Sequence, residues 1–136
     1  MNWFTYALIG AVLFSGMVLL FKKITATVKP ATLMLYVAIF LTIFYLLHVT
    51  ITKTPIKING SAMLWIAAAS LLSYIANLVY TKSIALAPNA GYSTTIVSLQ
   101  LVVITVASVF LFGAEINLIK GFGILLAIIS IVVLSL

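Results

Sequence analysis

Five apolar stretches, each long enough to cross a lipid bilayer, follow one another in a chain of only 136 residues. A helix that crosses the hydrocarbon core needs about 20 mainly apolar residues, because its backbone N–H and C=O groups must pair inside the segment. The stretches predict membrane-spanning helices at residues 3–21, 31–51, 62–86, 92–112 and 118–136. We therefore expect an all-α integral membrane protein with a single transmembrane domain over residues 1–136.

The composition agrees with this class. Hydrophobic residues make up 65% of the chain and charged residues 6%, whereas an ordinary soluble domain has roughly 25% charged residues. The net charge of +6 comes from seven lysines and one glutamate. In a membrane protein such an excess reflects loop orientation and contact with anionic headgroups. The expected partner is therefore the lipid bilayer and not nucleic acid, in a multi-pass protein of the plasma or inner membrane.

The inventory of reactive side chains argues against catalysis. The chain has one acidic residue, one histidine and no cysteine. Paired carboxylates for acid–base chemistry, a cage of metal ligands and a cysteine nucleophile are therefore all excluded. We expect no enzyme activity, no catalytic residue, no metal and no cofactor.

The lysines hardly favour one orientation in the membrane. The connections on one side of the five predicted spans carry four lysines, and those on the other side carry three. The two sets are Lys22, Lys23, Lys29 and Lys82 on the first and third connections, and Lys53, Lys57 and Lys120 on the second and fourth. Because the two sides differ by only one lysine, the positive-inside rule predicts almost no preference for either orientation. Either the N-terminus lies outside by a slight preference, or the chain inserts both ways.

Three short patterns follow one another in the second half of the chain. They are YTKSIALAPNAG at residues 80–91, VFLFGAE at residues 109–115 and GFGILL at residues 121–126. A Pro/Ala turn, a helix that closes on a Gly–Glu turn and a last helix led by Gly resemble the second half of an EamA-type repeat of the drug/metabolite transporter superfamily. The resemblance extends over nearly the whole chain. The extra Ala114 between Gly113 and Glu115 departs from it.

Most members of that superfamily carry two five-helix repeats in opposite orientation, and this chain has one. The resemblance therefore implies a transporter of a small-molecule metabolite that works by alternating access, as an antiparallel homodimer with the substrate at the midplane between the copies. The weak lysine bias is what such a dimer needs. Two alternatives stay open: an accessory subunit or flippase for a lipid-linked substrate, and a membrane scaffold that does not transport.

The small multidrug resistance proteins of the same superfamily are a second point of comparison. They are four-helix antiparallel dimers with a glutamate in the first helix for proton-coupled export. Aligning residues 10–13 with that helix places Ser15 where the glutamate would be. An intramembrane acid is needed to hold a cation in a low dielectric or to exchange protons for it. A cationic-drug/proton antiporter of that kind is therefore disfavoured.

One face of the third predicted span is polar. Its members, spaced three or four residues apart, are Ser70, Ser73, Tyr74, Asn77 and Thr81. At 100° per residue they occupy a face roughly 100° wide. We call them the polar stripe. They are candidate substrate-binding residues, and the alternative is that they join helices by hydrogen bonds. Asn77 is the main candidate, because its amide can both donate and accept.

Two residues outside the stripe complete the candidate substrate-binding set. Tyr6 lies on a face of the first span with Trp3, Gly10 and Met17. Lys82 follows the stripe directly and could contact an anionic substrate, or its ammonium could extend to the headgroups. His48 near the end of the second span has a simpler interpretation as an interfacial residue than as a proton relay.

Overall fold

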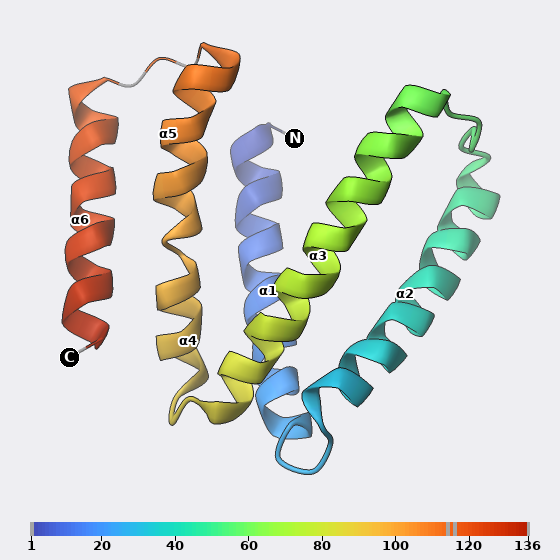
Figure 1. Ribbon diagram of the computed structural model, residues 1–136, viewed down its shortest axis with the longest axis horizontal. Coiled ribbons are helices and arrows are strands. Elements are labelled where there is room, and N and C mark those ends of the chain that lie inside the picture. Colours follow the sequence, from blue (N-terminus) through green and yellow to red (C-terminus); the bar gives the residue numbers. More distant parts are fainter. Residues whose placement is uncertain (1, 114, 116, 136) are drawn as a thin grey trace. The chain divides into compact units, whose positions relative to one another are not determined.

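The regular structure of this protein is helical throughout the described residues. The computed structural model describes residues 2–113, 115 and 117–135. Its helices are α1 (Trp3–Ile24), α2 (Pro30–Thr52), α3 (Gly60–Leu86), α4 (Ala90–Val97), α5 (Gln100–Phe112) and α6 (Leu118–Ser135) (Figure 1). The predicted all-α class is confirmed.

Four helical spans in the described part are long and apolar enough to cross a membrane: α1, α2, α3 and the stretch Ala90–Phe112, which contains α4 and α5. The fifth predicted span corresponds to α6, whose apolar helix Gly121–Val133 is shorter than a full span. Its predicted last residue, Leu136, lies outside the described residues, as do Ala114 and Ile116 of the preceding connection. The chain divides into two compact units, Met1–Leu86 and Ala87–Leu136.

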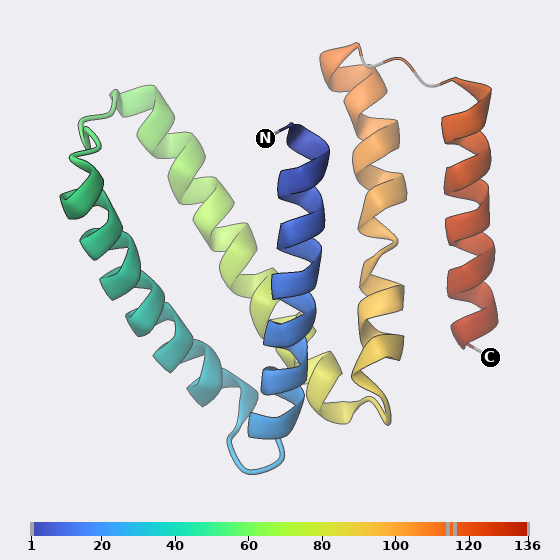
Figure 2. The ribbon, with the colours of Figure 1, turned by 180° about the vertical axis from the view of Figure 1, so that it is seen from behind.

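In the first unit, α1 and α2 both pack against α3. The side chains that this packing buries lie near one end of each helix. They are Val18 and Phe21 of α1, Leu33 of α2, and Thr81 and Ile84 of α3. Figures 1 and 2 show the end of α1, the start of α2 and the end of α3 meeting there. The remaining lengths of the three helices are mostly exposed and apolar, as expected for surfaces that face lipid or another chain.

Local sequence explains where these helices begin and end. Pro30 occupies the first turn of α2, where its missing N–H would be unpaired in any case. The α2 helix ends at Thr52 and is capped by Lys53, whose backbone is left-handed with φ 52°. The side chain of Asn59 accepts a hydrogen bond from the backbone N–H of Ala62 at 2.8 Å and so caps the N-terminus of α3. This cap extends the predicted third span by two residues, to Gly60.

In the second unit, α6 packs against α4 and α5. Asn89 caps α4 by accepting a hydrogen bond from the N–H of Gly91 at 2.8 Å, so α4 begins at Ala90 instead of the predicted residue 92. The carbonyl oxygen of Asn117 accepts the N–H of Gly121 at 3.0 Å. Asn117 therefore lies at the start of α6, where a cap was predicted, and the role of its side chain stays a prediction.

The fourth predicted span is interrupted at Ser98 and Leu99. There the N–H of Leu99 bonds to the carbonyl of Ile96 at 3.1 Å, a spacing of three residues that tightens the helix locally. The hydroxyls of Thr94 and Ser98 bond to carbonyls four residues earlier, at 2.9 and 3.0 Å. Hydroxyl groups bonded in this way weaken and bend helices. The stretch Ala90–Phe112 is still long and apolar enough to cross a membrane, and hydropathy alone does not predict the turn at Ser98 and Leu99 within it.

Candidate functional site

The polar stripe lies on one unbroken helix. Because α3 runs from Gly60 to Leu86 without interruption, the predicted spacing does place the five residues on one face. Ser70, Ser73, Tyr74 and Asn77 are exposed, Tyr74 with 64% of its surface accessible. The first four members are therefore not covered by α1 or α2 within their own unit.

Asn77 has unused hydrogen-bonding capacity. One N–H of its side-chain amide donates to the carbonyl oxygen of Ser73 at 2.8 Å, which fixes the side chain along the helix. An amide has two donor hydrogens and an acceptor oxygen. Among the described residues, the second N–H and the oxygen of Asn77 have no partner. The group can therefore donate to and accept from a molecule beside α3.

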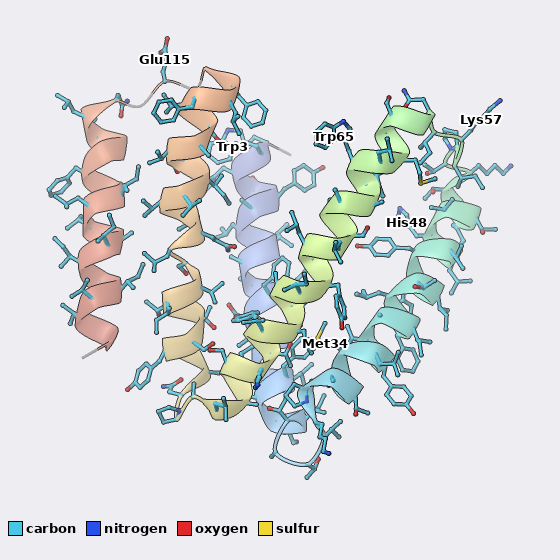
Figure 3. The ribbon with its side chains drawn as sticks, in the orientation of Figure 1. Trp3, Met34, His48, Lys57, Trp65 and Glu115 are labelled. Atoms are coloured by element: carbon cyan, nitrogen blue, oxygen red, sulfur yellow. The ribbon has the colours of Figure 1, made fainter. Side chains whose placement is uncertain are left out.

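Thr81 differs from the rest of the stripe because it is buried, with 1% of its surface exposed. Its hydroxyl donates to the sulfur of Met34 at 3.1 Å, joining α3 to α2. Figure 3 shows Met34 between these two helices. In this conformation Thr81 belongs to the helix packing, and a substrate could contact it only if α2 and α3 separated.

The two predicted residues outside the stripe are both exposed. Tyr6 of α1 has 62% of its surface accessible, and Lys82 lies on the last turns of α3. Within the described ranges, no hydrogen bond connects either side chain to the stripe. The structure therefore places Ser70, Ser73, Tyr74 and Asn77 on one exposed face of α3, and among the described residues it shows no hydrogen bond from Tyr6 or Lys82 to them.

Lys22 has a role that the sequence analysis missed. Its ammonium donates hydrogen bonds to the carbonyl oxygens of Ile84 at 3.1 Å and Ala85 at 3.3 Å. In a continuing helix the Ile84 carbonyl would accept the N–H of residue 88, but residue 88 is proline and has none. Lys22 supplies that donor and places a positive charge at the C-terminus of α3, where the helix dipole favours it. Pro88 was the sequence signal that could have indicated this role, because it leaves the carbonyl four residues earlier in need of another donor.

Neither His48 nor Glu115 belongs to the polar stripe. His48 lies on α2 (Figure 3). It lines a shallow hollow of about 300 Å³ together with Leu41, Phe44 and Tyr45. Glu115 is exposed in the connection between α5 and α6. In the part of the chain that the structure describes, no three His, Cys, Asp or Glu side chains are grouped as metal ligands would be.

Comparison with known proteins identifies the family. No curated protein and no solved structure matches the chain. A sequence model of one family does match, over residues 1–136. The match covers the helices described above and agrees with the resemblance seen in residues 80–126. The chain therefore belongs to the EamA-like transporter family, whose members are membrane transporters.

Proposed function

We propose that this protein moves a small polar metabolite across the plasma or inner membrane by alternating access, and that the substrate binds to the exposed part of the polar stripe on α3. Membership of the EamA-like transporter family supports transport as the general activity. The substrate contacts, the mechanism and the dimer described below are proposals.

The observation that carries the proposal is the exposed amide of Asn77. Asn77 lies four residues after Ser73, the middle residue of α3, or about 6 Å at a rise of 1.5 Å per residue. In a hydrocarbon core about 30 Å thick, a helix centred in the membrane would place this residue well away from the headgroups. A polar group facing lipid at such a depth is unfavourable, and such residues usually face a pathway or a partner. Ser70, Ser73 and Tyr74 extend the same exposed face.

The chain can complete a transport pathway as an antiparallel homodimer. With the shorter helix α6 counted as the fifth span beside the four full-length ones, the two ends of the chain lie on opposite sides of the membrane, so two copies of opposite orientation would reproduce the inverted repeats of larger transporters. The near balance of lysines, four against three on the two sides of the predicted spans, permits both orientations. The two polar stripes would then face the substrate from both copies.

Binding to purified protein tests the site directly. A ligand at 100 times its dissociation constant stabilises a protein by about 2.7 kcal/mol, so a thermal-shift screen of metabolites should reveal the substrate class. We expect small polar compounds to raise the melting temperature of the wild-type protein and to fail with Asn77→Leu. Compounds that stabilise both proteins equally would place the binding site elsewhere.

The orientation of the chain tests the dimer. Reporters fused to the C-terminus should be active on both faces of the membrane, because the lysine bias is weak. Two added lysines between α1 and α2 should fix one orientation and abolish transport, since opposite copies would no longer form. A wild-type fusion with a single orientation would contradict the antiparallel dimer and favour a parallel one.

A further inference from the structure

One end of the first unit is strongly basic. The end of α1, the connection to α2 and the last turns of α3 carry Lys22, Lys23, Lys29 and Lys82. Lys22 points onto the C-terminus of α3, where it donates to the carbonyl oxygens of Ile84 and Ala85. Lys23, Lys29 and Lys82 are exposed, and we call these three residues the basic end.

The chain cannot neutralise the basic end with its own acidic side chains. Its 136 residues include seven lysines and one acidic residue, Glu115. In the described ranges, Lys23, Lys29 and Lys82 form no ion pair. Three like charges carried at one end of the unit repel, and an external anion would relieve this repulsion. The basic end therefore has the charge of an anion-binding surface.

The helix ends that carry these lysines are held together. Lys22 connects α1 to α3, and the buried side chains of Phe21, Leu33 and Ile84 fill the space between the three helices. Lys29 immediately precedes Pro30, whose ring fixes the start of α2. A surface whose backbone is already ordered loses less entropy when a ligand binds.

The other end of the same unit provides a contrast. Lys53 and Lys57 lie in the connection between α2 and α3, where residues 54–59 have no regular structure. The side chains near this connection are exposed, including Ile51, Ile56 and Trp65. These two lysines have the same charge as two members of the basic end, but they do not lie on helix ends that are held together by buried side chains.

The position of the basic end along the spans indicates the ligand. Lys23 is next to the last residue of α1, and Lys82 lies four residues before the end of α3. Lysines at the ends of membrane helices extend their ammonium groups to the headgroup layer. The anions concentrated there are lipid phosphates. We propose that Lys23, Lys29 and Lys82 bind the headgroup phosphate of an anionic phospholipid. This proposal does not depend on which substrate the protein transports, or on whether it transports one.

Lipid binding to purified wild-type protein in detergent tests the proposal. The probes are phosphatidylglycerol and phosphatidylcholine with identical acyl chains, and native mass spectrometry counts the bound lipids. We expect a preference for phosphatidylglycerol that weakens in high salt. Each lysine near an anionic lipid corresponds to about a 5-fold change in affinity, so Lys23→Gln/Lys82→Gln should reduce the preference about 30-fold. Lys29→Gln alone should reduce it about 5-fold.

The matched control is Lys53→Gln/Lys57→Gln, which removes the same charge from the other end of the unit. We expect this pair to retain the wild-type preference. Equal losses in the two pairs would show a net-charge effect and overturn the proposal, and so would a wild-type protein without any preference. Inorganic phosphate that displaces the lipid at similar concentrations would identify a site for free phosphate and would also overturn it. If Lys23→Gln/Lys82→Gln does not fold, Lys29→Gln and the salt titration test the proposal instead. A preference for phosphatidylglycerol that neither of them weakens would overturn it.

Discussion

The ammonium nitrogen of Lys22 lies 3.1 Å from the carbonyl oxygen of Ile84 and replaces the backbone donor that Pro88 cannot provide. The two residues are 62 positions apart. The contact therefore connects the last turns of α1 and α3, at the end of the first unit where Phe21 and Ile84 are buried. A partly buried carbonyl without a donor is unfavourable, so Lys22 is a structural residue of this fold.

Replacement of Lys22 by methionine should destabilise the protein. Methionine keeps most of the length of the side chain but removes the charged donor from the carbonyls of Ile84 and Ala85. Hydrogen bonds to charged groups contribute about 1.5–3 kcal/mol. We expect a clear decrease in melting temperature in a detergent without anionic lipid. Lys23→Met is the control, because Lys23 is exposed; an equal decrease in both variants would contradict the role of Lys22.

The contact between Thr81 and Met34 should show measurable coupling. The Thr81 hydroxyl donates to the Met34 sulfur at 3.1 Å in a buried position. Thr81→Val and Met34→Leu each remove the contact with little change in volume, and each should cost about 0.5–1.5 kcal/mol. In the double variant the loss should be smaller than the sum of the single losses, because the contact can be removed only once. Additive losses in thermal melting would show that the two side chains do not interact.

The helical architecture could be predicted from hydropathy because the bilayer permits few alternatives. A run of about 20 apolar residues must pair its backbone internally, so the spans followed directly from the sequence. The boundaries depended on individual side chains. Because Asn59 and Asn89 cap their helices, α3 and α4 each begin two residues before the predicted start. The turn at Ser98 and Leu99 coincides with hydrogen bonds from the hydroxyls of Thr94 and Ser98 to backbone carbonyls, which a hydropathy profile does not report.

The candidate site was only partly predictable for a different reason. Helical periodicity placed the members of the polar stripe on one face, and that face exists. Periodicity does not say which part of the face another helix covers. Thr81 is buried against α2 while Asn77 is exposed, although the two residues are one turn apart. Lys22 was missed because its partners are backbone carbonyls distant in sequence, and a search for paired charges overlooks them.

Transport should not require a proton gradient. The only acidic side chain, Glu115, lies in the connection between α5 and α6, so no carboxylate is placed within a helical span to carry protons. Substrate uptake into vesicles should therefore continue after an uncoupler collapses the pH gradient. The relevant variant is His48→Gln, because His48 is the only histidine. Uptake that stops with the uncoupler and also requires His48 would refute this prediction and identify His48 as a proton relay.

The polar stripe leads to the most specific prediction. Asn77→Leu removes the exposed amide that we propose contacts the substrate and should reduce substrate affinity about 5- to 150-fold, corresponding to about 1–3 kcal/mol. Folding should be retained, because leucine is favourable in lipid and in apolar interfaces. Tyr74→Phe should weaken binding less, since it removes one hydroxyl, and Thr81→Val should do so as well, since Thr81 is buried.

Gln100→Leu is the matched control for Asn77→Leu, because it also replaces an exposed amide by leucine but lies on α5 and outside the stripe. Titration of the substrate against both variants, combined with their melting temperatures in detergent, separates two roles for Asn77. A large loss of affinity at unchanged stability, absent from the Gln100 variant, indicates a binding residue. A loss of stability at unchanged affinity would instead make the stripe a contact surface between helices of two copies. Binding would then have to involve Lys82, and Lys82→Met would have to abolish the binding of an anionic substrate.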